Sequence, residues 1–261
     1  MPENSTITVI VKDYEKISSV EVRKIMEDKI IGILGGMGPL ATADLFRKIV
    51  ELTDAGTDEE HIHIIIDSNA SIPDRTRAIL YGGDNPVPAM VKSAKFLEDS
   101  GAGLIVMPCN TAHYFIEEVQ KEIHIPIINM IACTAQAAKD LSLHTVGLLA
   151  TDGTCQSGIY HRTLNALQIR TVTPDNEQQK IIMDIIYKGV KGNDQSHIRY
   201  CDLKEILQDM ENRGAQAFLL GCTELPLVCD NSWSDKLFLN PTRILAQNAI
   251  TSAGKKVRKV K

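Results

Sequence analysis

The sequence lacks the features of a membrane protein, a secreted protein or a nucleic-acid-binding protein. No apolar run among its 261 residues approaches the roughly 18–20 residues that a transmembrane helix requires. The first residues are acidic and polar, whereas a secretory signal peptide begins with a basic and then an apolar region. The net charge is only −5, and basic residues cluster solely in the run 255–259, which is typical of a solvated tail. We therefore expect a cytoplasmic protein that binds neither membranes nor nucleic acids.

The sequence also lacks a recognisable metal or disulfide motif. None of the six cysteines forms the C-x-x-C pair of zinc and redox sites, and a chain of this length without a secretory segment favours reduced thiols. His61 and His63 have the spacing of two ligands on one face of a strand, but no third ligand is near them in the sequence. We therefore expect no metal ion. Four cysteines are expected to be packing residues: Cys133, Cys155, Cys201 and Cys229.

What is present is an alternation of short apolar runs and helical patterns, which favours an α/β fold with mainly parallel sheets. The length allows one large domain or two domains of about a hundred residues. The pattern predicts strands over residues 29–34, 61–67, 104–108, 145–150 and 169–173 and a sixth ending before Cys222. It predicts helices over residues 40–53, 86–100, 155–168, 174–190, 202–213 and 242–252.

Three pairs of segments resemble each other in the same order along the chain. The runs before Cys109 and before Cys222 both follow a Gly-Ala pair, and the two cysteines are 113 residues apart. Residues 31–38 likewise resemble residues 146–153, and residues 125–129 resemble residues 236–240. This repeat predicts two similar α/β lobes related by a pseudo-twofold axis, with the active site in the cleft between them.

The repeat also suggests how the chain is divided. Residues 1–28 precede the first repeated segment and form an N-terminal extension, with a strand expected at 6–11 and a short helix at 22–26. Lobe 1 would comprise residues 29–131 together with a C-terminal helix over 243–256. Lobe 2 would comprise residues 132–242.

A glycine-rich loop at residues 35–39 follows the first strand and has two interpretations. Residues 36–41 fit the G-x-G-x-x-(G/A) pattern of dinucleotide-binding loops, with Asp67 as a ribose acceptor, which keeps a nucleotide-binding oxidoreductase as a remote alternative. Pro39, however, removes one amide that such a loop would direct at a pyrophosphate. We favour a tight turn that lets the backbone approach a small anion at a helix N-terminus.

Cys109 and Cys222 each lie where a strand ends and a helix begins, the edge at which α/β sheets bind ligands. A helix N-terminus beside each thiol is expected to lower its pKa. Such a pair could form a redox couple, could carry out acyl transfer with His113 as a base, or could transfer protons at a carbon. Proton transfer fits two matched half-sites best, because a racemase needs a base on one face of the substrate and an acid on the other. Three residues that follow the cysteines can donate hydrogen bonds to a developing enolate: Asn110, Thr111 and Thr223.

Three basic side chains have less specific signals. Arg75 follows a strand end and could bind a carboxylate through two nitrogens, or it could form a surface ion pair with Asp74 or Asp84. Lys188 and Lys191 lie near a predicted helix C-terminus, where lysine commonly interacts with the helix dipole.

The chain resembles the aspartate racemase branch of the aspartate/glutamate racemase family over residues 29–250. The strings that carry this resemblance, in order, are GILGGMGPLAT, IPDRT, MPCNTAH, LLAT-x-GT and GCTEL. The resemblance implies an amino-acid racemase without pyridoxal phosphate or another cofactor, commonly a homodimer, with Cys109 and Cys222 as the catalytic pair. It further implies that Asn110, Thr111 and Thr223 bind the α-carboxylate, that Arg75 and Lys191 receive the side-chain carboxylate, and that Thr151 lines the cleft.

Details of the same strings distinguish branches of the family. Glutamate racemases resemble this chain less, because they have an Asp-Ser-Gly loop and a Thr-His pair where this chain has Gly-Gly-Met-Gly and Thr-Glu. Broad-specificity amino-acid racemases and maleate isomerase remain close, and a glutamate-accepting enzyme remains an alternative. Two cations favour a diacid substrate, since each unpaired buried charge costs several kcal/mol. A binding protein that has lost its chemistry is a further alternative, which the two intact thiols disfavour.

Overall fold

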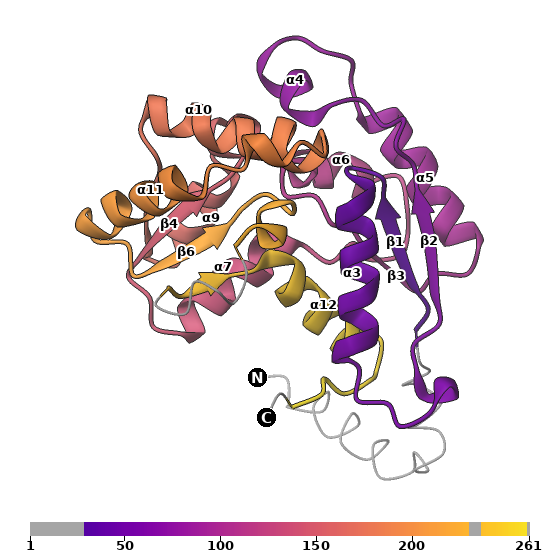
Figure 1. The fold of residues 1–261 in the computed structure, drawn as a ribbon. Coiled ribbons are helices and arrows are strands. Elements are labelled where there is room, and N and C mark those ends of the chain that lie inside the picture. Colours follow the sequence, from indigo (N-terminus) through magenta and orange to yellow (C-terminus); the bar gives the residue numbers. More distant parts are fainter. Residues whose placement is uncertain (1–28, 230–235, 260–261) are drawn as a thin grey trace, which may run out of the picture.

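The computed structural model describes residues 29–229 and 236–259. The strand and helix expected at residues 6–11 and 22–26 lie outside the described residues. Two parallel β-sheets form the framework, and each lies within its own group of helices (Figure 1). The expected α/β fold with parallel sheets is confirmed.

The first sheet has the order β2-β1-β3, with β1 over Ile31–Gly35, β2 over Ile64–Ser68 and β3 over Leu104–Val106. Alternate residues of β1 and β3 face opposite sides of the sheet. Ile31 and Ile33 pack against α3 (Pro39–Leu52) and α12 (Pro241–Ser252). Leu34 packs on the other side against α5 (Val87–Asp99) and α6 (Ile116–Gln120). The last helix of the chain therefore completes the core of the first sheet.

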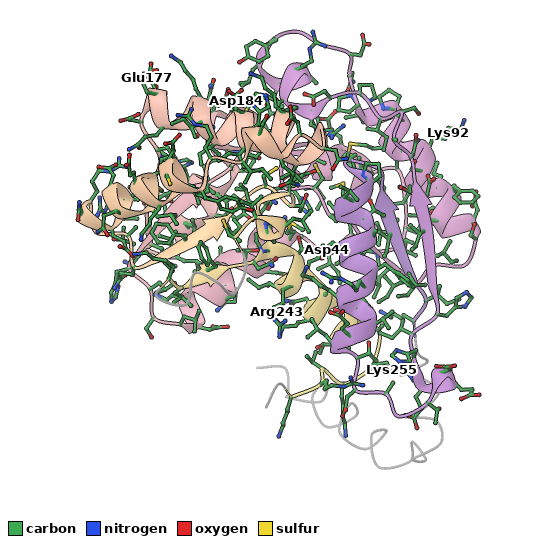
Figure 2. The ribbon with its side chains drawn as sticks, in the orientation of Figure 1. Asp44, Lys92, Glu177, Asp184, Arg243 and Lys255 are labelled. Atoms are coloured by element: carbon green, nitrogen blue, oxygen red, sulfur yellow. The ribbon has the colours of Figure 1, made fainter. Side chains whose placement is uncertain are left out.

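The second sheet has the order β5-β4-β6-β7, with β4 over Thr145–Leu149, β5 over Arg170–Val172, β6 over Ala217–Leu220 and β7 over Phe238–Leu239. One face packs against α7 (Met130–Asp140) and α9 (Ile159–Ala166). The other packs against α10 (Asn176–Asp184), the π-helix η3 (Ile185–Lys191) and α11 (Tyr200–Asn212). Apolar side chains fill both layers, while charged residues such as Lys92 and Glu177 point outward (Figure 2).

The two sheets have corresponding strand orders. A parallel bridge joins Ile105 of β3 to Ile127, so the first sheet continues in the direction in which β7 extends the second. Residue 127 lies in the segment 125–129 and β7 lies in the segment 236–240, which are one of the three pairs of similar segments in the sequence. The strand order is therefore what a duplicated lobe predicts, while the pseudo-twofold relation and the lobe boundaries remain predictions.

Several predicted boundaries were wrong, for local reasons. β3 ends at Val106, so Cys109 lies three residues beyond the strand, and the 3₁₀ helix η2 (Thr111–Phe115) follows it. His61 and His63 precede β2, so they do not share a strand face.

The helix predicted over residues 155–168 is two helices. The first, α8, spans Asp152–Ser157, because the Thr151 hydroxyl caps it by accepting a hydrogen bond from the Thr154 amide at 3.3 Å. It ends at Gly158, whose φ of 69° is a left-handed conformation that glycine adopts without strain, and α9 starts at the next residue.

Candidate active site

A small cavity lies between the two sheets, at the edge where their parallel strands end. It is lined by residues that follow β1, β2 and β3 on one side and β4, β5 and β6 on the other. Its volume is about 10 Å³, close to the space that one water molecule needs. All eight residues predicted from the sequence line this cavity: Arg75, Cys109, Asn110, Thr111, Thr151, Lys191, Cys222 and Thr223.

Cys109 and Cys222 reach the cavity from different sheets. Each is 6% exposed, and both thiols are free. His113 is not directed at the Cys109 thiol: its Nδ1 lies 2.8 Å from the Cys109 carbonyl oxygen, and its Nε2 accepts a hydrogen bond from the Met130 amide at 3.0 Å. Both ring nitrogens are therefore occupied by backbone groups, and this geometry does not support the acyl-transfer alternative, which needs the imidazole as a base.

The Cys222 thiol donates a hydrogen bond of 2.9 Å to Oε2 of Glu224. Burial of the thiol, followed by the adjacent Glu224 carboxylate, raises the pKa of Cys222 well above its ordinary value. The expectation that a helix N-terminus lowers this pKa was wrong. The segment after Cys222 contains only the three-residue 3₁₀ helix η5 (Leu225–Leu227), so burial and the nearby negative charge dominate.

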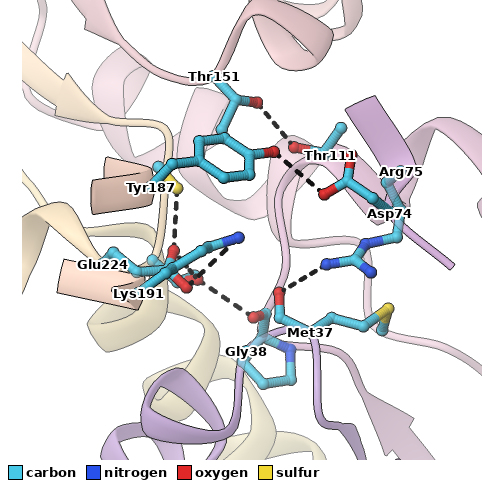
Figure 3. Close-up of polar contacts among 12 residues, drawn as sticks. Met37, Gly38, Asp74, Arg75, Thr111, Thr151, Tyr187, Lys191 and Glu224 are labelled. Carbon is cyan, nitrogen blue, oxygen red and sulfur yellow. Dashed lines mark hydrogen bonds and ion pairs between the residues drawn. The ribbon is translucent and has the colours of Figure 1, made fainter. Parts of the chain in front are cut away.

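Two of the predicted carboxylate donors, Asn110 and Thr111, lie in the loop after β3 and line the cavity. Asn110 accepts a hydrogen bond of 2.6 Å from the Tyr160 hydroxyl through Oδ1, whereas its buried Nδ2 has no partner among residues 29–229 and 236–259. The Thr111 hydroxyl lies 3.0 Å from that of Thr151 (Figure 3) and 2.8 Å from that of Thr154. An amide N–H is thus left available at the cavity wall, beside hydroxyl groups from both sheets.

Arg75 is the first residue of α4 (Arg75–Leu80) and is 7% exposed. Its terminal nitrogens donate hydrogen bonds to the carbonyl oxygens of Ile72, Pro73 and Met37 at 2.9–3.2 Å. Its buried Nε has no partner in the described part of the chain, and Arg75 forms no ion pair there. The alternative of a surface ion pair with Asp74 or Asp84 was wrong, because the guanidinium is held inside the molecule by backbone carbonyls (Figure 3).

Lys191 is the last residue of η3, and its Nζ lies 3.8 Å from Oε1 of Glu224. The same nitrogen lies 4.8 Å from the centre of the Tyr187 ring. Burial lowers the pKa of Lys191, but the Glu224 carboxylate and the Cys222 thiol oppose this and raise it above its ordinary value. The lysine is therefore charged at neutral pH. Lys188, by contrast, forms an exposed ion pair with Asp184 at 2.8 Å.

Two residues that the sequence reasoning did not select join the lobes at the cavity. The Tyr187 hydroxyl lies 3.2 Å from Oδ2 of Asp74, to which it donates, and 3.3 Å from the Thr76 hydroxyl (Figure 3). Tyr187 precedes Lys191 by four residues, a spacing that places both side chains on one helix face. Tyr187 could therefore have been selected from the sequence as a neighbour of Lys191. Glu224 could also have been selected from the sequence, because it belongs to the Thr-Glu string that follows Cys222.

The glycine-rich loop after β1 forms part of the cavity wall. Gly36 has a φ of 88°, and a Cβ there would lie 2.2 Å from the Asn69 carbonyl carbon, so only glycine fits. A Cβ on Gly38 would lie 3.3 Å from Oε1 of Glu224, so the loop packs closely against that carboxylate. These glycines therefore serve the packing of the site.

Neither a metal cluster nor a membrane span is found in the part of the chain that the structure describes. Residues 29–229 and 236–259 contain no group of three or more His, Cys, Asp or Glu side chains placed to hold a metal ion. None of the helices in those ranges has the length and hydrophobicity needed to cross a bilayer.

Comparison with known proteins places this geometry in a family. Residues 34–249 match the family described as Asp/Glu/Hydantoin racemase. The chain belongs to this family. A solved structure of Picrophilus torridus aspartate racemase is similar to it at 34% identity and a TM-score of 0.79, covering 88% of this chain and 96% of that one. The structure of PH1733, an aspartate racemase homologue from Pyrococcus horikoshii OT3, is similar at 25% identity and a TM-score of 0.70, covering 87% and 99%.

A curated relative widens the range of substrates within the family. The broad specificity amino-acid racemase RacX of Bacillus subtilis is 27% identical over 227 residues, which cover 85% of this chain and 97% of the relative. Membership of the Asp/Glu/hydantoin racemase family makes this protein an amino-acid racemase and hence an isomerase. The family gives no support to the remote alternative of a nucleotide-binding oxidoreductase.

Proposed function

We propose that this racemase interconverts L- and D-aspartate by transferring protons between the α-carbon and two thiols, Cys109 and Cys222, without pyridoxal phosphate. The observation that carries the proposal is that both thiols line one cavity from different sheets. A substrate held between them would present opposite faces of its α-carbon to the two sulfurs. One thiolate takes the α-proton while the other thiol supplies a proton to the opposite face, and the pair exchange these roles in the reverse direction.

The polar groups around the cavity would stabilise the charge that develops on the α-carboxylate. Asn110 has an unused amide N–H, and Thr111 contributes a hydroxyl from the same wall. Thr223, next to Cys222, currently directs its hydroxyl to the Pro108 carbonyl oxygen at 3.3 Å. Donors fixed before the reaction lower the barrier because they need no reorganisation as the enolate forms. Acid–base help from the thiols contributes about 10²–10⁴ in rate.

Two cations at the cavity favour aspartate over a neutral amino acid. Arg75 and Lys191 line the same cavity from different sheets, and a second carboxylate on the substrate would partner the buried Arg75 guanidinium, which a neutral substrate leaves without an anionic partner. The likeness to the aspartate racemase of Picrophilus torridus supports this substrate. The runner-up is a broad-specificity enzyme, or one that also accepts glutamate, which the likeness to the Bacillus subtilis relative supports.

The decisive experiment is chiral analysis of products from L- and D-aspartate, glutamate and alanine in deuterated water, without added cofactor. Two-base transfer predicts that the newly formed enantiomer carries deuterium while the remaining substrate keeps its original hydrogen in early turnover. Each of Cys109→Ala and Cys222→Ala is expected to lose at least about 10²-fold in racemisation rate, because inversion needs a group on each face.

Cys201→Ala is the matched control, because Cys201 is an exposed thiol at the start of α11. This variant is expected to keep wild-type activity. Full racemisation by either Cys109→Ala or Cys222→Ala would refute the two-thiol mechanism, and absence of α-carbon exchange in the wild type would indicate a binding protein. Faster turnover of alanine than of aspartate would replace the aspartate assignment with the broad-specificity alternative.

The resemblance also predicts a homodimer in the cytoplasm. Light scattering of the purified chain tests the first of these, with a mass of twice 28.8 kDa expected.

A further inference from the structure

The two thiols of the cavity have different surroundings. The Cys222 sulfur donates to a carboxylate oxygen of Glu224 at 2.9 Å. The Cys109 sulfur makes no side-chain hydrogen bond within the described ranges. The two cysteines therefore differ in their hydrogen bonding, although they occupy corresponding places in the two repeats. The difference comes from Glu224, which lies two residues after Cys222, because the residue two after Cys109 is Thr111.

Glu224 is fixed in place by contacts with both of its oxygens. It is 2% exposed. Oε2 accepts from Cys222 and lies 3.3 Å from the Thr223 hydroxyl, while Oε1 lies 3.8 Å from the Lys191 ammonium. The bare backbone of Gly38 packs against Oε1. The Lys191 ammonium and this carboxylate form an ion pair at that distance, and a carboxylate oxygen is an acceptor for the thiol hydrogen bond.

The remaining titratable groups at the cavity do not offset this effect at Cys222. Lys191 and the backbone amide of Glu224 favour the Cys222 thiolate, but burial and the Glu224 carboxylate outweigh them, and Lys191 is already engaged with Glu224. Burial raises the pKa of Tyr187 to about 12, so this phenol is neutral at pH 7. The groups that face the cavity from other elements are Cys109 in the loop after β3 and Asp74 and Arg75 at α4.

We infer that Glu224 is a positioning residue that keeps the proton on Cys222 in the free enzyme, so that Cys222 starts as the acid and Cys109 as the base. This inference rests on the proposed two-thiol function. Cys109 thiolate takes the α-proton from one enantiomer, and Cys222 gives its proton to the opposite face of the α-carbon. The enzyme is left with a Cys109 thiol and a Cys222 thiolate next to Glu224. A proton must then leave Cys109 and one must return to Cys222 before the same enantiomer reacts again.

The asymmetry has a defined kinetic consequence. L- and D-aspartate have the same free energy in water, so kcat/KM must be equal in the two directions. If one protonation state of the free enzyme is preferred, the kcat values for L- and D-aspartate differ. The KM values for the two enantiomers then differ by the same factor. Glu224→Gln is expected to bring the two kcat values closer together, because the amide carries no charge to disfavour the Cys222 thiolate. Glu224→Asp is expected to restore part of the difference.

The direct test is the pH dependence of alkylation of each cysteine by iodoacetamide, followed by peptide mass spectrometry on the full chain. In Glu224→Gln, the pH at which Cys222 becomes half-reactive is expected to fall by about one unit or more, which is about a tenfold faster reaction on the rising limb. The profile of Cys109 is expected to change less. Glu177→Gln is the matched control, since Glu177 is an exposed carboxylate on α10 (Figure 2).

An unchanged Cys222 profile in a folded Glu224→Gln variant would overturn the inference. If circular dichroism shows that this variant does not fold, Glu224→Asp replaces it, because the shorter side chain withdraws the charge from the sulfur. In Glu224→Asp, the pH at which Cys222 becomes half-reactive is expected to fall by a smaller amount. An unchanged Cys222 profile in that variant would also overturn the inference. Alkylation needs no turnover, so it tests the protonation of Cys222 separately from the two-thiol mechanism. If the Cys222 alkylation profile shifts in Glu224→Gln while Cys109→Ala or Cys222→Ala remains active, the two-thiol function is refuted and the effect of Glu224 on Cys222 still holds.

Discussion

At the scale of single residues, Arg75 has a structural role in addition to the substrate-binding role proposed above. Its terminal nitrogens hold the carbonyl oxygens of Ile72, Pro73 and Met37, which join α4 to the glycine-rich loop. A guanidinium has five N–H donors in a rigid plane, of which the backbone uses only part, and Arg75 is one of the residues that line the cavity. A lysine ammonium at the same site would keep the charge but could not reproduce this geometry.

We predict that Arg75→Ala raises the KM for aspartate by about 10–100-fold, because a charge-assisted hydrogen bond is worth about 1.5–3 kcal/mol. Turnover of alanine, which has no second carboxylate, is expected to change far less. Steady-state kinetics with both amino acids gives this comparison, and Arg75→Lys is expected to be intermediate. Lys188→Ala, which removes only an exposed ion pair, serves as the control. Equal effects on the two substrates would place Arg75 away from the substrate side chain.

At the scale of secondary-structure elements, His113 joins η2 to the start of α7. Its ring contacts the Cys109 carbonyl oxygen on one side and the Met130 amide on the other. An imidazole nitrogen that accepts from an amide carries no proton, so Nδ1 is the nitrogen that donates to the Cys109 carbonyl. Burial lowers the pKa of His113 to about 4. The neutral ring therefore holds the loop that presents Cys109 to the cavity.

We predict that protonation linked to His113 destabilises the fold as the pH falls from about 6.5 towards about 4. The unfolded chain binds a proton near the ordinary pKa of 6.5, whereas the folded chain resists it. The free energy of unfolding should fall by about 2 kcal/mol between pH 7 and pH 5 from this group alone. Urea unfolding at the two pH values measures the change.

His113→Gln should lack this component of the pH dependence, although it is less stable at pH 7. The control is His124→Gln, because the His124 side chain is 97% exposed. The same pH dependence in His113→Gln and in the wild type would contradict the prediction.

At the scale of the whole molecule, the structure is a closed state. An amino acid is several times larger than a water molecule, whereas the cavity has a volume of about 10 Å³. Substrate must therefore enter after the groups that bridge the two sheets separate. One bridge is the Tyr187 hydroxyl on η3 with Asp74 and Thr76 at α4. Others are the hydrogen bonds between Thr111 and Thr151 and between Asn110 and Tyr160, named above.

We predict that Tyr187→Phe favours opening of the cavity, because it removes the hydroxyl and keeps the ring beside Lys191. One lost hydrogen bond is worth about 1 kcal/mol, so the open state that admits substrate becomes about fivefold more populated and the KM is expected to fall by up to the same factor. Hydrogen–deuterium exchange of the α4 amides should become faster. Tyr200→Phe, a change at an exposed tyrosine on α11, should alter neither measurement. Unchanged exchange and unchanged KM in Tyr187→Phe would show that this contact does not control opening.

Sequence reasoning succeeded where the signal was local or repeated. Apolar periodicity predicted β1 to β6 and the helices α3, α5, α9, α10, α11 and α12, but not α4, α6, α7 or β7, and the repeat predicted two lobes of similar α/β structure. It failed at details that depend on a specific capping or burial contact. α8 begins at Asp152, three residues before the predicted helix start, because Thr151 caps it. The pKa of Cys222 is raised, whereas we expected it to be lowered.

The sequence by itself therefore determined the α/β class, the family and the residues that converge on the cavity, since these follow from periodicity, repetition and short motifs. Only the tertiary structure decided which side chains meet across the lobes. Tyr187 reaches Asp74, Thr111 meets Thr151, and Tyr160 donates to Asn110. Contacts of this kind depend on side-chain direction and on distances of a few ångströms between segments that lie far apart in the chain, and no local pattern encodes those distances.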